Sequence, residues 1–440
     1  MKKIGLMLIL IMILLSAQGL WAKGTSEEVP EKTGQEPAVE ISFWHIFPEG
    51  DPTFDMFDTM VKNFNASQSE VKVEHMGISF WDYWTKLTTS IAGGTGPDIY
   101  LNTAENVQAR IDAKTIVNLT PYFQRDGISM DRYIQNQIEY MSDNNGNLYA
   151  FPYGTPVRVL YYDKDMFRKA GLDPEKPPKD WEELEEYAEK LTVFKDREKN
   201  LIDTIGFDPA MGNYYFWTIA WTNGGRFFDD DLNPTINSPE NLEALEWMVN
   251  MHRKYGTKAM QAFESQTSAL KVDPFIAGKA AMEVHNESLY AQVKQFAPEK
   301  NIGVSAIPYP EERANWSSGF TLEIADKGST KQADGAWEFF WTLISPEGEK
   351  AFFENTGWIM SDKSLLEDPA VKSDPIFAAI LAEVPYARNR VYVKEAQNWH
   401  ELITPSIEAA LIGNISPKDA LDQAQKAVED AITNYKKTNK

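Results

Sequence analysis

The sequence predicts a soluble α/β protein with two lobes. Its 440 residues exceed the size at which a single hydrophobic core stays efficient, so two cores are the default expectation. The 43% hydrophobic and 25% charged residues give the balance of an ordinary water-soluble protein. Segments with the pattern of a strand alternate with segments that have a helical apolar face, and this alternation is typical of a parallel α/β sheet.

The first 22 residues have the pattern of a secretory signal peptide. Lys2 and Lys3 precede an uncharged run, 4–15, that is too short to span a bilayer comfortably, and small residues suited to cleavage follow it. An uncleaved membrane anchor is the alternative interpretation. Residues 23–38 are rich in Glu, Pro, Gly, Lys and Thr and have little to bury, so we expect a flexible lead-in to the first lobe.

The absence of cysteine and the acidic charge exclude several kinds of site and partner. Without cysteine there is no disulfide, thiolate metal site, thiol catalysis or lipid attachment through a cysteine behind the signal. A released protein would be lost from a cell with one membrane, so we expect the periplasm of a two-membrane bacterium. The formal net charge of −22 repels phosphate backbones and anionic lipid, so we do not expect nucleic acid or a membrane surface as a partner.

The first part of the chain alternates strands and helices. The glycine-rich turn 93–97 follows a helix and precedes a strand, whereas a phosphate-binding loop must precede a helix, so we expect no nucleotide there. The expected strands are 41–44, 71–74 and one that starts at Asp98, and the expected helices are 54–64 and 82–92.

Residues 149–192 are the most informative segment. Pro152 and Pro156 favour extended backbone ahead of the apolar run 157–162, which predicts a buried strand. Two helices follow, with Asp163 as the cap of the shorter one and Asp180 as the cap of the longer one.

The rest of the chain carries further helices and strands. Ser238 is the expected cap of a helix that begins at Pro239, after a hairpin over 227–236. Further strands are expected at 281–285, 302–307 and 317–324, and helices at 214–221, 239–255, 331–343, 346–355, 399–411 and 417–435.

The order of elements in 149–192 resembles the hinge crossing of the bacterial extracellular solute-binding proteins, family 1, which are maltose-binding-protein-like sugar-capturing subunits of ABC importers. That family shows aromatic-Pro, a strand, Tyr-Asn-Lys-Asp, Phe, Ala-Gly-Leu, Pro-Pro and Trp-Glu-Glu-Leu, and this chain departs from it only at Asp163, where Asn is usual. The resemblance extends along the chain through KLTTSIAGGTGPDIYL, FIAGKAAMEVHN, SSGFTLEIA and WEFFWTLISPEGEKAFFENTGWIM.

The resemblance implies a type II flytrap fold, in which two lobes are joined by three crossings and the ligand lies between them. It implies a periplasmic substrate-binding subunit that captures a sugar or small oligosaccharide and delivers it to the permease subunits of an ABC transporter. We expect a monomer without catalytic activity, cofactor or bound metal. The expected lobes are 39–152 with 309–355 (N-lobe) and 153–308 with 356–440 (C-lobe).

A sugar site needs aromatic rings for the apolar faces of the sugar, flanked by groups that bond to its hydroxyls. Core packing is the alternative role of each aromatic ring. The aromatic candidates, at loop or element-end positions, are Trp44, Trp81, Tyr214, Trp217, Trp316, Trp358 and Trp399. The other candidates for ligand contact are Glu49, Asn102, Glu105, Tyr153, Asn286, Ser318 and Gly319, with Glu105 placed by family position and Asn102 at a position that is often aromatic in the family.

The basic candidates are Arg158, Arg388 and Arg390. Solvated arginine is the simpler interpretation, because arginine side chains are mostly exposed. If several of these side chains point into the cleft, the ligand is an acidic sugar or a sugar phosphate, because a guanidinium group binds carboxylate and phosphate through two parallel hydrogen bonds.

Other functions stay open or are disfavoured by particular residues. A secreted glycosidase or lyase acting on polysaccharide needs two carboxylates facing one cleft, and the 65 acidic residues leave that alternative open. A chemoreceptor that recognises the closed form cannot be distinguished from sequence. The run 229–240 resembles a calcium loop but has Pro234 where glycine is required, so we expect a hairpin there.

Overall fold

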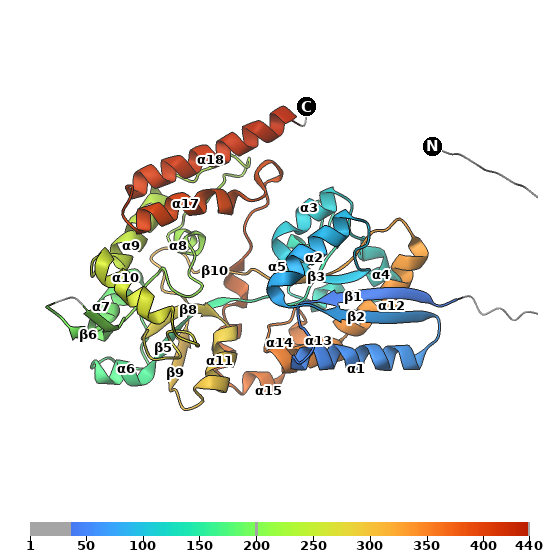
Figure 1. The fold of residues 1–440 in the computed structure, drawn as a ribbon, viewed down its shortest axis with the longest axis horizontal. Helices are drawn as coiled ribbons and strands as arrows, with labels where there is room; N and C mark the ends of the chain where they lie inside the picture. The colour runs from blue at the N-terminus through green and yellow to red at the C-terminus, as the bar shows by residue number, and fades with distance from the viewer. Residues whose placement is uncertain (1–36, 199–200, 439–440) are drawn as a thin grey trace, which may run out of the picture. The chain divides into compact units, whose positions relative to one another are not determined.

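The computed structural model describes residues 37–198 and 201–438. The expected signal peptide and the lead-in as far as residue 36 lie outside the described residues. From Ala38 onward the chain forms one compact unit. Within it, Figure 1 shows two separate main sheets, one built from the blue N-terminal strands and one from the green and yellow middle strands.

The first sheet has the strand order β2-β1-β3-β11-β4. β1 is parallel to β2 and β3, whereas β11 is antiparallel to β3 and β4, so the sheet is mixed. The early strands β1, β2 and β3 therefore confirm the predicted parallel α/β pattern, and β11 departs from it. The strands are β1 (Val39–His45), β2 (Val71–Gly77), β3 (Ile99–Thr103), β4 (Phe151–Pro152) and β11 (Phe320–Ile324).

The helices of the first sheet begin where the sequence provides caps. Asp51 accepts a hydrogen bond from the backbone of Thr53 at 2.8 Å, and Pro52 occupies the first turn of α1, where its missing N–H costs nothing. Phe57 and Val61 of α1 are buried in the core beside the sheet. The helices here are α1 (Pro52–Ser67), α2 (Phe80–Ala92), η1 (Ala104–Asn106), α3 (Val107–Asp112), α4 (Thr120–Arg125), η2 (Met130–Arg132), α5 (Gln135–Tyr140), α12 (Thr330–Ile344) and α13 (Pro346–Thr356).

The second sheet, β8-β5-β9, is antiparallel throughout, so the parallel pattern of the first strands does not extend to this part of the chain. β8 and β9 both run opposite to β5, which lies between them. Alternation of strands and helices predicts parallel neighbours only when successive strands pair, and here an earlier strand is inserted between two later ones. The strands are β5 (Arg158–Asp163), β8 (Met282–Asn286) and β9 (Ile302–Ser305), and β6 (Val193–Asp196) and β7 (Leu201–Thr204) form a separate hairpin.

The predicted caps of the second sheet's helices are confirmed. Asp163 accepts hydrogen bonds from the backbone of Asp165 and Met166 at 3.0 and 2.9 Å, and Asp180 accepts one from Glu183 at 2.9 Å. The helices are α6 (Lys164–Lys169), α7 (Trp181–Leu191), α8 (Phe216–Thr222), α9 (Pro239–His252), α10 (Thr257–Thr267) and α11 (Ser288–Phe296).

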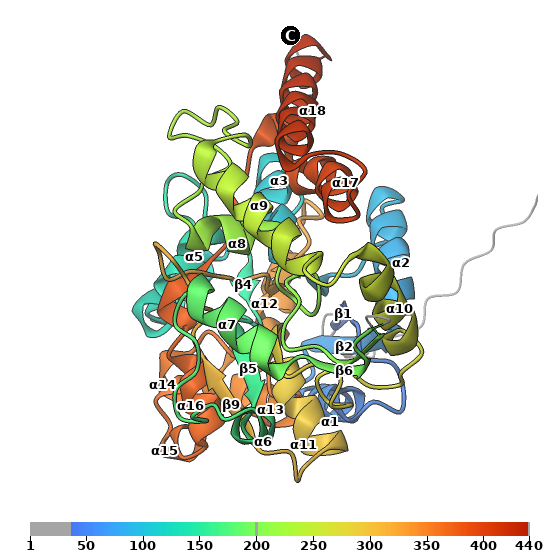
Figure 2. The ribbon, with the colours of Figure 1, turned by 90° about the vertical axis from the view of Figure 1, so that its left-hand side faces the viewer.

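The C-terminal part of the chain packs back onto the second sheet's helices. α17 and α18 contact each other and α9, as Figure 2 shows. The predicted hairpin at 227–236 is confirmed by a bridge between Phe228 and Pro234. The remaining elements are α14 (Lys363–Leu366), α15 (Pro369–Lys372), α16 (Pro375–Leu381), η3 (Val384–Tyr386), η4 (Lys394–Ala396), α17 (Trp399–Leu411), α18 (Pro417–Thr438), and the short parallel pair β10 (Asn315–Trp316) and β12 (Ala387–Arg388).

The segments that connect the two sheets lie side by side. The backbone of Phe320 donates to Gly154 at 3.1 Å, and the backbone of Thr155 donates to Ile359 at 2.8 Å. Gly154 has φ +114°, and a Cβ there would lie 2.7 Å from the indole of Trp358, so this position requires glycine. The connections thus form one narrow, hydrogen-bonded bundle.

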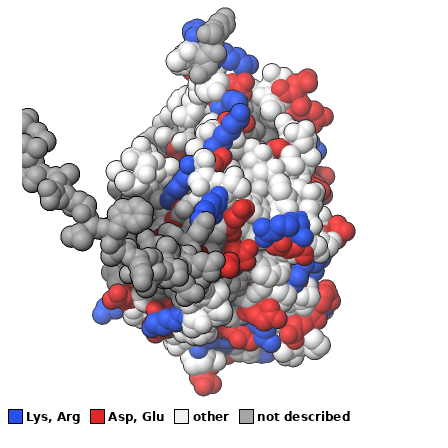
Figure 3. Space-filling view, turned by 90° about the vertical axis from the view of Figure 1, so that its right-hand side faces the viewer, with Lys and Arg blue, Asp and Glu red and all other residues white. Residues whose placement is uncertain are grey.

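The surface is polar, with charges of both signs. In the part of one face that Figure 3 shows in colour, basic and acidic side chains are interspersed. Across the residues that the structure describes, no helix has the combination of length and apolar character that a membrane span requires.

Candidate functional site

The side chain of Trp316, on β10, lies between two arginines. The guanidinium carbon of Arg158 is 4.1 Å from the centre of the Trp316 ring, and that of Arg390 is 5.0 Å away. Arg390 also lies 4.6 Å from the ring centre of Trp217. Cation–π contacts at these distances hold the cations and rings in fixed positions. We call Glu105, Arg158, Tyr215, Trp217, Trp316, Ser318 and Arg390 the arginine–tryptophan cluster.

Arg158 is buried at the start of β5 and fixes the neighbouring segment. Its Nη1 donates to the backbone oxygen of Trp316 at 2.8 Å, and its Nη2 donates to Oγ of Ser318 at 2.9 Å. Its Nε finds no acceptor among the described residues. Burial lowers the pKa of Arg158 to about 10, against the opposing influence of the Glu287 carboxylate, so the guanidinium stays charged at neutral pH.

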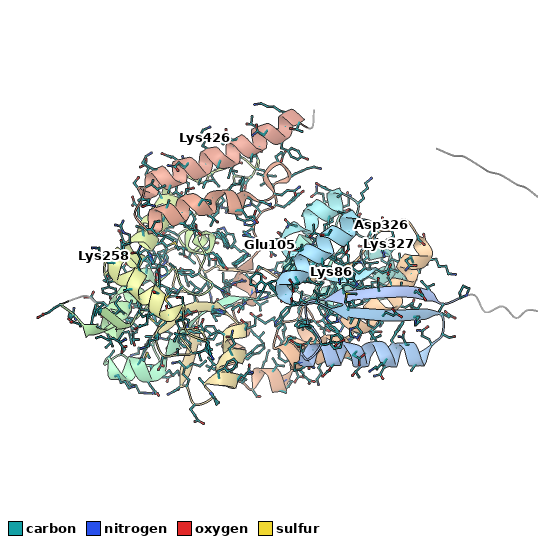
Figure 4. The ribbon with its side chains drawn as sticks, viewed as in Figure 1. Lys86, Glu105, Lys258, Asp326, Lys327 and Lys426 are labelled. Atoms are coloured by element: carbon teal, nitrogen blue, oxygen red, sulfur yellow. The ribbon has the colours of Figure 1, made fainter. Side chains whose placement is uncertain are left out.

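Arg390 and Glu105 form an ion pair between distant parts of the chain. Glu105 lies on η1, directly after β3 of the first sheet, and Arg390 follows β12. The hydroxyl of Tyr140 donates to the backbone oxygen of Arg390 at 3.2 Å and holds the same loop. Figure 4 shows Glu105 at the edge of the first sheet's helices that faces the second sheet's elements. Burial lowers the pKa of Arg390, and the Glu105 carboxylate opposes this shift.

An aromatic surface adjoins the two arginines. The ring of Tyr215 stacks on Trp217 with 4.7 Å between centroids and 4° between planes, and it meets Trp316 edge-on at 4.9 Å. Tyr215 is 40% exposed, so part of it remains open to a ligand. Tyr215 and Trp217 also line a cavity of about 240 Å³ beside α17. Neighbouring Tyr214, not Tyr215, was expected at the site, and the only sequence signal for Tyr215 is the Tyr-Tyr-Phe-Trp run before α8.

A second aromatic group lies on the first sheet's side. Phe320 stacks on Trp358 with 4.6 Å between centroids and lies nearly parallel to Trp84 at 6.2 Å. Trp81, one turn before Trp84 on α2, is 83% exposed. Trp84 and Phe320 were not expected at the site, although Trp84 shares a helical face with Trp81.

Several predicted polar residues already have partners within the protein. Asn102 accepts a hydrogen bond from the backbone of Thr103 at 2.8 Å, and the backbone oxygen of Gly319 accepts one from Ala104 at 2.9 Å. Arg388 pairs with Glu312 at the surface.

Three further candidates lie at element ends. Glu49 is exposed in the loop after β1. Trp44, at the end of β1, is partly buried and has the ammonium of Lys86 5.2 Å from its ring centre. Asn286 ends β8 and accepts from the hydroxyl of Ser288 at 2.6 Å.

The structure corrects the expectation that Tyr153, Tyr214 and Trp399 offer open surfaces, and Trp217 and Trp316 are also buried, each with 6% of its surface exposed. Tyr153 is fully buried, and its ring centre lies 4.4 Å from that of Phe352. Tyr214 is 3% exposed and belongs to the core behind α8. Trp399 is 1% exposed, and its indole N–H donates to the backbone of Val391 at 3.0 Å. Each residue stands beside a loop in sequence, but segments distant in the chain cover it in the fold.

The groups of the cluster are of the kinds that bind polyhydroxylated ligands. Glycoside cleavage requires two carboxyl groups on opposite sides of one bond. Glu105, the acid within the cluster, is paired with Arg390. Glu287 is buried near Arg158, and burial raises its pKa to about 7. Ring faces, guanidinium N–H groups and one carboxylate are groups that hold a polyhydroxylated ring.

Comparison with known proteins gives consistent matches. The family model of the bacterial extracellular solute-binding proteins matches residues 59–379. The sn-glycerol-3-phosphate-binding periplasmic protein UgpB of Escherichia coli strain K12 is 24% identical over 425 residues, which cover 91% of this chain and 94% of UgpB.

Solved structures match over similar lengths. CpMnBP1 with mannotriose bound has 25% identity and a TM-score of 0.76, over 89% of this chain and 100% of its own. The ABC substrate-binding protein Lmo0181 from Listeria monocytogenes, in complex with cycloalternan, has 24% identity and a TM-score of 0.74, over 89% and 98%. Maltose-bound MalE3 of T. maritima has 22% identity and a TM-score of 0.72, over 89% and 100%. These likenesses confirm the predicted two-lobed α/β fold.

Proposed function

The chain belongs to the bacterial extracellular solute-binding proteins, and from this premise we propose that it is the periplasmic substrate-binding subunit of an ABC importer. In this role it captures a sugar or a small oligosaccharide between its lobes and delivers it to the membrane permease. It acts as a monomer and leaves the ligand chemically unchanged.

The observation that carries this proposal is the position of Trp316 between Arg158 and Arg390, with the exposed ring of Tyr215 beside it. Aromatic faces suit the C–H faces of a sugar, and guanidinium groups and the Glu105 carboxylate suit its hydroxyls. Two relatives support the same class of ligand, since CpMnBP1 carries mannotriose and MalE3 carries maltose, whereas UgpB is named for sn-glycerol 3-phosphate, which is anionic.

The charge of the cluster favours a neutral saccharide. Arg390 already pairs with Glu105, and Glu287 lies close enough to Arg158 to influence its pKa. An anionic sugar would need to displace the Glu105 carboxylate from Arg390, and its own negative charge would be repelled by that carboxylate. A neutral saccharide can instead accept from the arginines and donate to Glu105 without breaking the pair, so it is the ligand class we propose.

The lobes close around the ligand by rotation at the connecting segments. We propose lobes of 39–152 with 309–355 and of 153–308 with 356–440. The hydrogen bonds from Phe320 to Gly154 and from Thr155 to Ile359 support a common hinge, because they tie the segment after residue 152 to the start of β11 and to the segment after residue 355. A ligand that contacts both lobes favours the closed form, and the permease recognises its surface.

A thermal-shift screen with product analysis tests this function. The purified chain is heated with mannobiose, mannotriose, maltose, galacturonate and glycerol 3-phosphate. A neutral saccharide at 100 times its dissociation constant adds about 2.7 kcal/mol to the free energy of unfolding and is recovered unchanged. Released monosaccharide would favour the glycosidase alternative, and stabilisation by anionic compounds alone would contradict the neutral ligand.

A further inference from the structure

Three potential metal ligands converge beside β8, apart from the arginine–tryptophan cluster. One ligand atom each of Asp273, Glu283 and His285 lies within 4.8 Å of the others. Glu283 and His285 are alternate residues of β8, so the pleat directs both side chains to the same face of the sheet. Asp273 follows α10, and its carboxylate also accepts a hydrogen bond from the backbone of Phe275 at 2.8 Å. The residues therefore come from two segments that the fold brings together.

Glu283 is the unusual member of this group. It is 1% exposed, and neither of its carboxylate oxygens has a hydrogen-bond partner among the described residues. A Cβ on Gly212 would lie 2.6 Å from Oε1 of Glu283, so the absence of a side chain at Gly212 provides the space for this carboxylate. A buried carboxylate without a partner is costly, because nothing replaces the water it has lost. This carboxylate therefore lacks a partner that a cation would supply.

His285 is oriented in the way that protein metal ligands commonly are. Its Nδ1 lies 3.0 Å from Oδ1 of Asn286. That oxygen also accepts from the backbone and the hydroxyl of Ser288, at 3.2 and 2.6 Å, which identifies it as the amide oxygen. Nδ1 of His285 therefore carries the proton, and Nε2 keeps its lone pair. An oxygen that fixes the tautomer of an imidazole is typical of the surroundings of bound zinc.

We propose that Asp273, Glu283 and His285 form a binding site for a divalent transition-metal cation, with zinc as the preferred ion. One imidazole and two carboxylates suit Zn²⁺, whereas Ca²⁺ and Mg²⁺ prefer oxygen ligands alone. Three protein ligands with water in the fourth position complete a tetrahedral zinc site. The proposed transport function does not require this site, and the site revises the expectation from sequence that the chain binds no metal.

A neighbouring group of similar composition has a simpler explanation and provides a control. Nδ1 of His252 lies 3.0 Å from Asp208, and its Nε2 lies 3.8 Å from Glu264. Both ring nitrogens face carboxylates, and a protonated imidazole satisfies them without a metal. Glu264 is about half exposed, so its replacement should disturb the fold little.

The test measures zinc binding by untagged protein that has been treated with EDTA and dialysed. Isothermal titration with Zn²⁺ should give one site per chain, and Ca²⁺ and Mg²⁺ should not compete. Glu283→Gln and His285→Gln should each weaken binding by at least about tenfold, and Glu264→Gln should leave it unchanged. Because either variant could fail to fold, circular dichroism checks each one, and Asp273→Asn serves as a third.

A Co²⁺ spectrum gives an independent readout. Wild-type protein should show the visible absorption of Co²⁺ bound in a tetrahedral protein site, and the Glu283→Gln variant should not. Wild-type protein that binds no Zn²⁺, or an effect of Glu264→Gln equal to that of Glu283→Gln, would overturn the proposal.

Discussion

Glu105 and Arg390 form an ion pair that joins the helical turn after β3 to the loop after β12. The guanidinium of Arg390 is nearly buried and also lies against Trp217. One contact therefore links the first sheet's side of the molecule to the aromatic surface proposed for the ligand. Its loss should affect both folding and binding.

Replacing Glu105 with Gln should lower the free energy of unfolding by roughly 2 kcal/mol. Breaking a fully buried ion pair costs about 3–5 kcal/mol, and the loss here should be smaller because Glu105 is partly exposed. Urea denaturation measures it, with Arg388→Met as the matched control. The Arg388 pair is exposed at both ends, so its loss should cost at most about 1 kcal/mol. Equal losses in the two variants would show that the Glu105 pair is an ordinary surface contact.

Replacing Trp81 with Ala should weaken saccharide binding without destabilising the protein. Its ring is 83% exposed, so the free energy of unfolding should change by no more than about 0.5 kcal/mol. An aromatic contact worth about 0.5–1.5 kcal/mol corresponds to a loss of affinity of roughly 2- to 12-fold. Calorimetric titration with mannotriose gives the affinity. Phe296→Ala, which removes an aromatic ring that is 54% exposed, is the control and should bind like the wild type.

Replacing Gly154 with Ala should damage the connection between the sheets. The new methyl group would meet the indole of Trp358, and the positive φ is unfavourable for alanine. Gly146→Ala is the control, because Gly146 also has a positive φ but has no atom within 4 Å of the added Cβ. The Gly154 variant should lose about 1–3 kcal/mol more than the control in urea denaturation. Equal losses of unfolding free energy in the two variants would mean that a small shift of Trp358 makes room for the methyl group.

Acid should destabilise the protein through His45. This side chain is fully buried, and burial with the neighbouring His75 lowers the pKa of His45 to about 3. At pH 5 the unfolded chain takes up a proton that the folded protein does not. The stability due to this group is therefore complete above pH 6.5 and is lost as the pH falls toward 3, with about 2 kcal/mol gone by pH 5.

Urea denaturation at pH 7.5 and pH 5 measures this loss. Phe43 and Phe57 lie within 5.1 Å of the imidazole between ring centroids, so His45→Phe should fit its surroundings. Between pH 7.5 and pH 5, the free energy of unfolding of the variant should fall by about 2 kcal/mol less than that of the wild type. An identical pH dependence in both proteins would contradict the assigned pKa.

Elements with a strong local signal could be predicted from sequence. The caps at Asp163 and Asp180 depend on a side chain and the two or three residues after it, so they are visible in the sequence. α10 was missed, since Gly256 precedes it and no side chain caps its first turn. The pairing of β10 with β12 was missed because it joins two-residue strands that are about 70 positions apart.

The site was predictable by residue type but not by arrangement. Trp217, Trp316 and Arg158 were expected near the ligand, yet no sequence pattern places Arg390 against both tryptophans. Trp399 was a candidate because it begins a helix after a loop, and contacts with Phe227 and Val391 bury it instead. Burial of such aromatic residues depends on tertiary contacts, which local sequence does not encode.

Isothermal titration of the purified chain with mannotriose, and with glycerol 3-phosphate in parallel, tests the central claim most directly. We expect saturable binding of the neutral saccharide at one site per chain, weakened by replacing Trp316 or Arg390 in variants that remain folded. Binding of glycerol 3-phosphate alone, or saccharide binding that is unchanged in both folded variants, would contradict it.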